Sequence, residues 1–574
     1  GMRLVGPNCV GVMDTFLPLD TTFITNMPAK GAIGFVSHSG AICGGTIDWA
    51  NSVGVGFSRI VSLGNQLDVD IADGIHLLDQ DANTRVISVY AEGLPDGRKF
   101  VDMAASVYRR KPIVMLKAGL TAAGSRAVSS HTGAMAGSAV AYGAACHRAG
   151  VLAVHTLQEQ NDVAMALATQ PLPTGNRVAL LTNAGGPAAL AADELGKYGL
   201  CLANLAMDTK MKLLGATPPG TQRDNPVDML GGPESVMFRD AGQILLDDPG
   251  VDMLMSIFVP QALTPVNAVA QSVIDSARQG HKPVICCLVG GDSITEAVQL
   301  LNTNGVPFYQ DPNRASRALA GLVQYQQLRK RESLKPIPVI DVDADRVRAL
   351  LAAVWQNRGA GFIPPNVAVQ ILSAYGIPVP LSAIAGSAEE AIRIAEGFKH
   401  PVAIKIVADG IIHKADVGGI FLNLQDAAEV REAYNRIVRD NPLWRVLIQS
   451  MVPPGQEVIV GMQRDPQFGP LLMFGTGGAY VEISHDVAFR LAPLCRHDAF
   501  DMIRGTIAGQ ILQGVRGDQP RDIDSTVDVL LRVGQLANDF HCISELDINP
   551  LIISAQGEGC WAVDGRIAID QMPV

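Results

Sequence analysis

Two consecutive stretches of this chain show the same order of strand-like and helix-like segments, and this repeat constrains the fold more than any other feature. The first stretch has apolar strand-like runs at 33–37, 57–63, 85–90 and 111–117, with helix-like runs at 41–51 and 70–80. Strands that alternate with helices and are almost continuously apolar are typical of a parallel sheet with helices on both faces. The sequence therefore predicts a doubly wound α/β domain over residues 31–165.

The second stretch predicts a copy of this domain over residues 170–330. A strand-like run at 177–182 leads through a glycine-rich turn into a helix-like run at 187–198. The later segments match those of the first stretch in order, 247–258 with 79–90 and 281–288 with 110–116. Self-similarity of this kind indicates a repeated architecture.

A polar and proline-rich stretch at 324–338 separates the two copies from a third region over 345–574. This region mixes helices and strands without regular alternation, which is typical of an α+β domain. The expected helices are 345–355, one that ends at Tyr375, and 387–397, and the expected strands are 401–406, 446–450, 457–462 and 471–475.

Charge and cysteine content restrict the partners and the compartment. The 574 residues carry a net charge of −11, which argues against a nucleic acid or a membrane surface as partner. No apolar run approaches the ~20 residues of a membrane-spanning helix, and no secretory signal is visible. The nine cysteines are scattered without a CxxC pair, as in reduced cytosolic proteins. We therefore expect a cytoplasmic protein.

The segment Ser129–Ser138, which the second copy lacks, carries the most reactive candidate side chain. Its sequence, Ser-Ser-His-Thr-Gly-Ala-Met-Ala-Gly-Ser, places His131 among small residues in a loop after the strand at 111–117. Small neighbours allow other backbone segments to approach the imidazole, which can then act as a nucleophile toward phosphate. A histidine in a loop more often has no such role, so both interpretations stay open on these residues alone.

Two turns from strand to helix are candidate anion sites, one in each copy. Ser37-His-Ser-Gly40 and Asn183-Ala-Gly-Gly186 each place free backbone N–H groups at the positive end of a helix dipole. Their equivalent places fit one pseudo-symmetric phosphate pocket, although every doubly wound sheet contains ordinary turns of this kind. Glu92 ends a buried strand at the sheet edge where ligands bind, and it is either an orienting group for an imidazole or a solvated loop residue.

Charged side chains in the third region predict a nucleotide site with a metal. Lys405 ends an apolar strand before a glycine-rich loop, where an ammonium group can neutralise phosphates. Glu545, Asp547 and Asn549 alternate along one strand and project from one face, which suits Mg²⁺. Asp564, expected on the paired strand of a hairpin, adds a carboxylate. Acidic strand faces also occur where the side chains simply face solvent.

Together these motifs show that the chain resembles the NDP-forming acyl-CoA synthetases, relatives of succinyl-CoA synthetase that include ADP-forming acetyl-CoA synthetase. The resemblance covers essentially the whole chain. It implies two flavodoxin-like doubly wound domains, with parallel sheets, followed by an α+β ATP-grasp domain over 345–574. The segments that carry it are, in order, Gly6–Gly11, Ser37–Gly40, Ser130–Ala134, Asn183–Gly186, His413–Gly419, Gly475–Gly478 and Asp547–Pro550.

The resemblance also implies a role for each candidate residue. His131 matches the histidine that is phosphorylated during turnover, and Glu92 matches the glutamate that holds it. His413 matches a second histidine, which carries phosphate between the nucleotide and the first one. The remaining matches are phosphate contacts by Ser39, Gly40, Ala184 and Gly185, ATP contacts by Lys405, Gln449, Val452 and Glu457, and magnesium ligation by Asn549 and Asp564 with Asp547 beside them.

The start of the chain departs from the family pattern. The family normally opens with a Rossmann-like CoA-binding domain, of which Gly6–Gly11 matches only the last strand. We therefore expect residues 1–30 to be the remnant of that domain, with an opening apolar strand followed by an irregular connection over 12–30. The rest of the CoA-binding domain would be missing or supplied by another polypeptide.

The sequence thus predicts an ADP-forming acyl-CoA synthetase that converts a carboxylate, CoA and ATP into acyl-CoA, ADP and phosphate through a phosphohistidine. The resemblance implies Mg²⁺ as the metal and a homo-oligomer as the assembly. Two alternatives remain, a related regulatory protein that senses CoA or nucleotide and a lyase that uses the same acyl-CoA chemistry. The residues leave the identity of the acid open.

Overall fold

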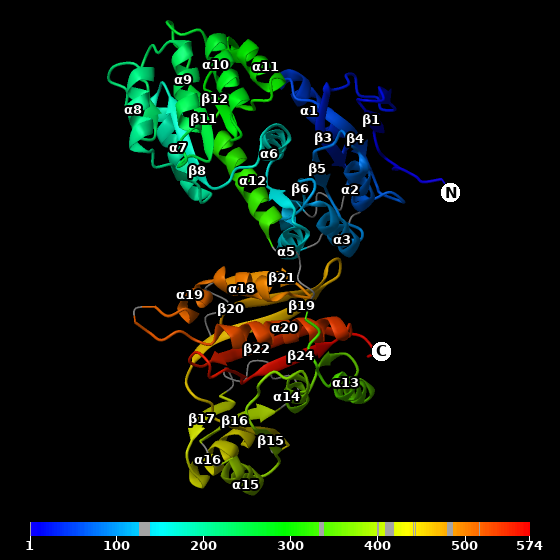
Figure 1. Ribbon diagram of the computed structural model, residues 1–574. Coiled ribbons are helices and arrows are strands. Elements are labelled where there is room, and N and C mark those ends of the chain that lie inside the picture. The colour runs from blue at the N-terminus through cyan, green and yellow to red at the C-terminus, as the bar shows by residue number, and fades with distance from the viewer. Residues whose placement is uncertain are drawn as a thin grey trace. The chain divides into compact units, whose positions relative to one another are not determined.

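The computed structural model of the protein is shown in Figure 1. It describes residues 2–124, 138–331, 338–398, 401–407, 418–439, 441, 443–478, 486–515 and 517–573. The chain divides into two compact units, Gly1–Glu332 and Ser333–Val574. Among the helices described, none is long and apolar enough to cross a membrane.

The first unit contains two sheets, and the first of them is the doubly wound sheet expected at the start of the chain. Its strands, in sheet order, are β2 (Leu19–Asp20), β1 (Val12–Asp14), β4 (Phe57–Ser62), β3 (Lys30–Ser37), β5 (Val86–Ala91), β6 (Ile113–Lys117) and β7 (Leu152–Val154). Every neighbouring pair from β4 to β7 is parallel. Ser37 lies in register with Ser62 and Tyr90, so the carboxyl ends of β3, β4 and β5 meet at one edge.

The beginning of the chain differs from the sequence prediction. The described residues before Val12 form no strand, so the expected opening strand is wrong, and β1 and β2 lie where irregular chain was expected. β1 pairs with β4 in the antiparallel direction, which makes the sheet mixed rather than purely parallel. The pairing covers an edge that β4 would otherwise leave open, and it buries Met13. Strands this short carry no readable hydrophobic period.

Helices cover the first sheet, and capping residues mark where they begin and end. They are α1 (Gly40–Val53), α2 (Ile71–Gln80), α3 (Gly97–Val107), α5 (Ala139–Ala149) and α6 (Leu157–Thr169). α1 begins after Ser39, whose side chain accepts from the Ile42 amide, and ends at Gly54, which adopts a left-handed φ of 76°. A reciprocal capping box between Asp70 and Asp73 begins α2.

All strands of the second sheet of the first unit pair in parallel. Its strands are β10 (Val227–Asp228), β8 (Arg177–Thr182), β11 (Met253–Phe258), β12 (Val284–Leu288) and β13 (Phe308–Tyr309), and β9 (Cys201–Leu202) also pairs with β8. The helical elements are α7 (Gly185–Lys197), α8 (Met207–Ala216), α9 (Ser235–Leu246), α10 (Val266–Gln279), η1 (Asp292–Ile294), α11 (Thr295–Thr303) and α12 (Pro312–Lys330).

The two sheets of the first unit share one hydrophobic core. One cluster of buried side chains includes Phe35 and Phe57 from the first sheet together with Met253 and Ile285 from the second. α12 packs on both α6 and α7. The join also has a buried polar contact, because Asp162 on α6 forms an ion pair with Arg314 on α12 at 2.8 Å. The two copies are therefore parts of one unit.

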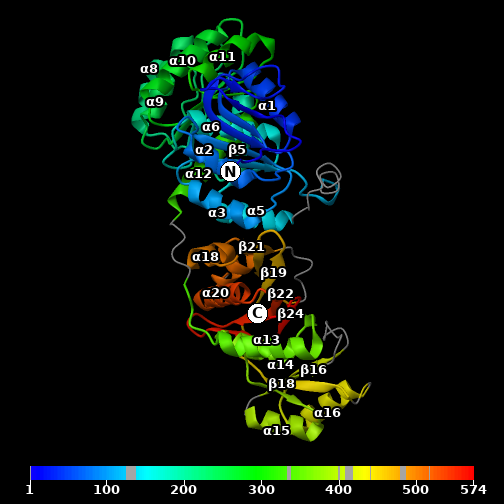
Figure 2. The same cartoon turned by 90° about the vertical axis from the view of Figure 1, so that its right-hand side faces the viewer.

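The second unit also contains two sheets (Figure 2). The larger has the order β14 (Gly361–Phe362), β24 (Gly565–Ile569), β22 (Ile543–Ile553), β19 (Gln456–Asp465), β20 (Gly469–Thr476) and β21 (Val487–Leu491), with β23 (Cys560–Ala562) paired to β22. The smaller has the order β15 (Ser382–Ala385), β18 (Arg445–Ser450), β16 (Val402–Val407) and β17 (Ile420–Leu424). The helices are α13 (Ala344–Arg358), α14 (Pro365–Ala374), α15 (Ala388–Phe398), α16 (Ala427–Val438), α18 (Arg496–Arg504), α19 (Ile507–Leu512) and α20 (Ile523–Asp539).

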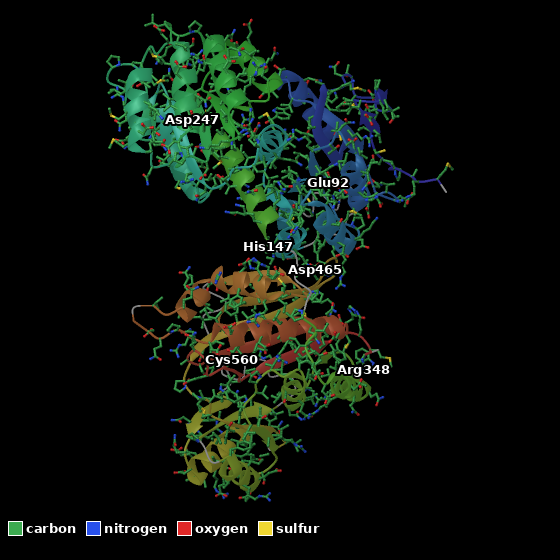
Figure 3. All side chains as sticks on the ribbon, viewed as in Figure 1. Glu92, His147, Asp247, Arg348, Asp465 and Cys560 are labelled. Atoms are coloured by element: carbon green, nitrogen blue, oxygen red, sulfur yellow. The ribbon has the colours of Figure 1, made fainter. Side chains whose placement is uncertain are left out.

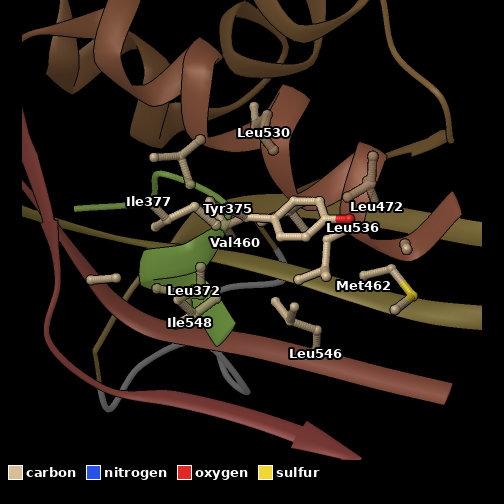
Figure 4. Packing of buried hydrophobic residues seen from close by; sticks show 14 of the residues in the cluster. Leu372, Tyr375, Ile377, Val460, Met462, Leu472, Leu530, Leu536, Leu546 and Ile548 are labelled. Atoms are coloured by element: carbon tan, nitrogen blue, oxygen red, sulfur yellow. The ribbon is translucent and has the colours of Figure 1, made fainter. Parts of the chain in front are cut away.

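The larger sheet of the second unit is held against its helices by an apolar core around Tyr375 (Figure 4). Leu530 and Leu536 of α20 pack in the same cluster as Val460 and Leu546 of the sheet. The Tyr375 hydroxyl donates to Asp539 at 2.7 Å, so its polar end is satisfied although its ring is buried. α15 and α16 form a second cluster with β16 and β18. These strands and helices confirm the α+β pattern expected over 345–574.

Candidate active site

The start of α1 is braced from the strand before it. The Ser37 hydroxyl donates to the carbonyl of Ser39 at 2.9 Å and accepts from its amide at 3.1 Å. The Ser39 side chain accepts from the Ile42 amide, and the Ser39 carbonyl accepts from the Cys43 amide. No hydrogen bond between described residues uses the amides of Gly40 and Ala41. These two N–H groups are therefore available to an anion at the positive end of the helix.

The start of α7 repeats this brace. The Thr182 hydroxyl donates to the carbonyl of Ala184 at 3.0 Å and accepts from its amide at 2.9 Å. Ala184 has no side chain that can cap the helix. A Cβ on Gly185 would lie 3.1 Å from Oδ2 of Asp228, so a carboxylate borders this helix start. Both predicted turns therefore have the geometry of anion sites, but no hydrogen bond between described residues joins them, and their shared phosphate pocket stays a prediction.

His38, a residue that the sequence prediction did not single out, connects the α1 turn to Glu92. Its Nδ1 accepts from the amides of Glu92 at 2.9 Å and Gly93 at 3.4 Å, so the proton of the neutral ring is on Nε2. Burial lowers the pKa of His38 to about 4. The ring is therefore neutral near pH 7, and it fixes the backbone at the end of β5. The sequence offered one indication of this role, which is the position of His38 inside the predicted turn, between Ser37 and Ser39.

Glu92 directly follows β5 and lies in the first unit (Figure 3). Lys117, the last residue of β6, donates from Nζ to the Glu92 carbonyl at 2.9 Å and to the Ala118 carbonyl at 2.7 Å. Burial, and after it the charge of Glu92, raises the pKa of Tyr90. The backbone around Glu92 is thus fixed from two sides, and the structure brings this residue together with the α1 turn. His131 and His413, with the segments around them, lie outside the described residues.

In the second unit, the structure brings Asn549 and Asp564 together through their backbones. The backbone N–H of Asn549 donates to the backbone carbonyl of Asp564 at 3.1 Å, and the side-chain Oδ1 of Asn549 accepts from the backbone N–H of Gly478 at 3.1 Å. Asp564 lies one residue before β24, not on the strand itself, which corrects the expected hairpin position. Lys405 is buried on β16 and donates from Nζ to the Val563 carbonyl at 2.6 Å. The structure thus places Lys405 beside the segment that holds Asp564, and their shared nucleotide site stays a prediction.

Asp547 gives a test of whether this site suits a cation. Burial raises its pKa to about 6, with Arg566 opposing the shift and the charges of Asp564 and Glu545 adding to it. Repulsion between neighbouring carboxylates is what a divalent cation relieves, so the residues fit Mg²⁺. In the part of the chain that the structure describes, no three His, Cys, Asp or Glu side chains lie close enough to hold a metal. The predicted ligands are two carboxylates and one amide, so they are not such a group of three.

Three further residues were predicted to contact ATP, and they lie at or near the ends of interior strands of the two sheets of the second unit. Gln449 on β18 is buried, and its Nε2 has no hydrogen-bond partner among the described residues. Val452 is half-buried just after that strand. Glu457, near the start of β19, approaches Gly478, because a Cβ on that glycine would lie 2.9 Å from Glu457 Oε2. The Gly478 turn, which the sequence prediction did not assign a contact, therefore joins Glu457 to Asn549.

Family models match three parts of the chain. A succinyl-CoA ligase-like flavodoxin domain matches 30–167, a ligase-CoA domain matches 178–335, and an ATP-grasp domain matches 355–569. An ADP-forming acetate–CoA ligase I of Archaeoglobus fulgidus is 39% identical over 578 residues, which cover 100% of this chain and 82% of that one. The chain belongs to the ADP-forming acyl-CoA synthetase family.

This ADP-forming acyl-CoA synthetase has other relatives of the same kind. A 4-hydroxybutyrate–CoA ligase of Nitrosopumilus maritimus, also ADP-forming, is 34% identical and covers 99% of this chain and 82% of that one. A solved acetyl-CoA synthetase 1 of Candidatus Korarchaeum cryptofilum, in complex with phosphate and ADP, gives a TM-score of 0.54 at 34% identity. The match covers 57% of this chain and 72% of that one.

These matches confirm the predicted family and fold class, and they identify the protein as an enzyme of the ADP-forming acid–thiol ligase type. They favour this function over the regulatory and lyase alternatives, because the relatives that match the whole length of the chain are ligases. CoA and the adenine nucleotide are its small-molecule partners. The domain boundaries and the site residues expected from the sequence stay predictions.

Proposed function

We propose that the synthetase forms acyl-CoA from a carboxylate, CoA and ATP through a phosphoryl group carried on His131. The observation that supports this most is the start of α1, where the amides of Gly40 and Ala41 are available beside a fixed Glu92. N–H groups at a helix start stabilise the negative charge of a phosphoryl group. A carboxylate such as Glu92 accepts from one imidazole nitrogen while the other nitrogen bears the phosphoryl group.

The chemistry at this site proceeds in two steps. An oxygen of the substrate carboxylate attacks phosphorus, so that an O–P bond forms, the N–P bond breaks and acyl phosphate results. The sulfur of the CoA thiolate then attacks the acyl carbon, so that a C–S bond forms, the C–O bond breaks and phosphate is released. Because His38 is neutral, it does not compensate the charge of Glu92. The Glu92 carboxylate can accept a hydrogen bond from the reacting imidazole, which leaves phosphorus as a neutral ring that keeps this N–H.

The second unit would bind the nucleotide. Lys405 places a positive charge beside the Asp564 segment, and the unpartnered Gln449 Nε2 offers a donor to the base. Asn549 and Asp564, with Asp547 beside them, would hold Mg²⁺. When bound, this ion neutralises phosphate charge during phosphoryl transfer. Glu457 would bind the ribose, and Val452 would line the hinge beside the base. His413 would carry the phosphoryl group toward His131.

A labelling experiment tests the phosphohistidine. Incubation with γ-labelled ATP should label the protein, and the label should be acid-labile and stable in alkali, as a phosphoramidate is. His131→Asn should abolish both labelling and ADP release. His155→Asn is the matched control, because His155 is an exposed histidine that follows β7. A label that persists in His131→Asn would overturn the proposal.

A second variant separates the two histidines. If His413 carries the phosphoryl group, His413→Ala should block labelling from ATP but not labelling from acyl-CoA plus inorganic phosphate. Equal labelling of His413→Ala from ATP and from acyl-CoA plus inorganic phosphate would show that the phosphoryl group reaches His131 directly, without His413. We also propose that the chain forms a homo-oligomer, as the resemblance implies. Light scattering of the purified protein measures this directly, and a monomer at all concentrations would contradict it.

A further inference from the structure

A cavity of about 500 Å³ runs along α1 from the helix start that would bind the phosphoryl group. On the helix it is lined by Gly40, Ala41, Gly44, Ile47, Asp48 and Asn51. These residues lie on successive turns of one helix face, which extends about 16 Å at 1.5 Å per residue. The cavity therefore begins where the carboxylate must meet phosphorus and leads away from that point.

The wall opposite the helix comes from Val10 and from the segment 23–26. Ile24 packs against the hydrophobic core of the first unit, whereas Phe23 is 82% exposed. A phenyl ring that is left in water beside a cavity offers apolar surface for a ligand to cover. Asp48 is the one charged side chain among the lining residues. A ligand that fits these walls has an apolar part for Phe23 and Ile24, an uncharged polar part for Thr25 and Asn26, and no second negative charge.

Gly44 lies in the wall of the cavity and has open space beside it. A Cβ at this position would meet nothing within 4 Å among the described residues, so the space beside the helix is open there. Gly45 is also open by the same measure, but it does not line the cavity. Both lie inside α1, where glycine is unfavourable relative to other residues by roughly 1 kcal/mol. Glycine at 44 thus leaves room that any side chain would occupy.

We propose that this cavity binds the chain of the carboxylate substrate and selects acids larger than acetate. The class it fits is a monocarboxylic acid with an apolar or aromatic chain that ends in an uncharged polar group. The apolar part would lie against Phe23, Ile24 and Ile47, and Asn51 would meet the polar end. Asp48 would repel a second carboxylate. The inference rests on the proposed function, because it takes the start of α1 as the place where the carboxylate reacts.

The volume supports this choice over a two-carbon acid. Small-molecule sites enclose about 300–1,000 Å³ and cover most of the ligand surface. Acetate would leave most of this cavity filled with water and would leave Phe23 exposed. A hydroxyaryl acid such as 4-hydroxyphenylacetate would cover the apolar wall and place its hydroxyl toward the polar residues further along α1.

The test compares Gly44→Leu with Gly45→Leu in the full chain. Both substitutions exchange a helical glycine for leucine, so both gain the same helix propensity, but only the first fills the cavity. We expect kcat/KM for 4-hydroxyphenylacetate relative to that for acetate to fall at least tenfold in Gly44→Leu. The ratio should be unchanged in Gly45→Leu. An unchanged ratio in both variants would overturn the proposal.

Two further arms separate this inference from the proposed function. Ligand-observed NMR measures the binding of 4-hydroxyphenylacetate without CoA or turnover, and Gly44→Leu alone should abolish the signal. If no acid supports ADP release, the proposed function fails, while the NMR result still decides the cavity. If Gly44→Leu instead raises KM for CoA equally with every acid, the cavity belongs to CoA and the inference is wrong.

A dicarboxylate of similar length tests the role of Asp48. It should bind the wild type poorly and Asp48→Asn better, and equal binding to both would contradict that role.

Discussion

The starts of α1 and α7 are two versions of one turn, and they differ in how the middle residue is satisfied. At α7, Asn183 pairs with the Val259 backbone in both directions, at 2.9 Å each, and uses its whole amide group. At α1, His38 accepts from two amides through Nδ1, and its Nε2 has no partner among the described residues. The middle residue of the α7 turn thus has its hydrogen bonds satisfied, whereas the hydrogen bonds of the α1 turn require the His38 ring to stay neutral.

The surroundings of the two turns also differ, and they favour anion binding at α1. Ser39 caps α1, whereas Ala184 provides no cap for α7, where the Asp228 carboxylate lies beside Gly185. A carboxylate at a helix start competes with a bound anion for the same amides. We infer from the comparison that α1 is the stronger anion site and that α7 is the weaker one.

The largest effect should come from Gly40→Ala. A Cβ at Gly40 would lie 2.2 Å from Cγ1 of Val10, so either that side chain or the start of α1 must move. A displacement near 1 Å at a reacting centre can cost about 100-fold, and we expect a loss of kcat/KM approaching this size. Gly185→Ala, with its nearest contact at 3.1 Å, should lose far less.

A compensating variant makes this prediction sharper. Adding Val10→Ala to Gly40→Ala removes the clashing methyl group and should restore most of the activity. Steady-state kinetics of the two single variants and the double variant measure the coupling. Equal losses for Gly40→Ala and Gly185→Ala would show that the two helix starts are equivalent.

The next effect concerns His38→Leu. It removes the acceptor for the buried amides of Glu92 and Gly93, and a buried unsatisfied polar group costs about 1–3 kcal/mol. We expect a loss of about 2–3 kcal/mol in the free energy of unfolding, measured by urea denaturation, together with reduced labelling of His131. His38→Asn, which copies the residue at the α7 turn, should recover most of both. A His38→Leu protein with parental stability and labelling would show that His38 does not position Glu92.

The fold followed from the sequence where the hydrophobic pattern was long. The runs at 33–37 and 177–182 are confirmed as β3 and β8, and the segment 247–258 contains β11, because fully buried strands need continuous apolar residues. β1 and β2 were missed, since strands of three and two residues have no period. Their position depends on the free edge of β4, which is a property of the folded sheet.

The sequence predicted residues of the candidate site only where they lie in a recognisable motif. The alternation of Glu545, Asp547 and Asn549 predicted one strand, and β22 contains all three. A backbone hydrogen bond brings Asn549 beside Asp564, while their role as metal ligands stays a prediction. The role of His38 was missed, because its partner amides are 54 and 55 residues away. The cavity along α1 was missed for the same reason, since segment 23–26 reaches it only through tertiary packing.

The pH dependence of stability gives a smaller test of the same comparison. The pKa of His38 is about 4 in the folded protein, below its ordinary value of 6.5. Below pH 6.5 the unfolded chain binds a proton that the folded chain does not, so stability is complete above this pH and falls as the pH approaches 4. Between pH 7 and pH 5 the loss from this group should be about 2 kcal/mol.

The contribution of His38 is isolated by subtraction. Other groups titrate over the same range, but His38→Asn removes only this one. The unfolding free energy of the parent minus that of His38→Asn, measured by urea denaturation at several pH values, should therefore fall by about 2 kcal/mol from pH 7 to pH 5 and change sign. A constant difference would show that the ring is already protonated or that its pKa is ordinary. Asn183→Asp is not a suitable control, because it adds a titrating group of its own.

The smallest effect concerns the two caps. Ser39→Ala removes a side-chain acceptor for the Ile42 amide and should destabilise the protein by about 1 kcal/mol, the usual value for an N-cap. Ala184→Ser adds the missing cap at α7, whose N-cap residue already has an extended φ of −150° and ψ of 114°, and should stabilise by about 0.5–1 kcal/mol. Thermal or urea unfolding measures both changes. Because the hydroxyl introduced by Ala184→Ser would also meet the α7 amides that a phosphate needs, the stabilised variant should bind inorganic phosphate no better than the parent. Stabilisation accompanied by tighter phosphate binding would mean that α7, and not α1, is the stronger anion site.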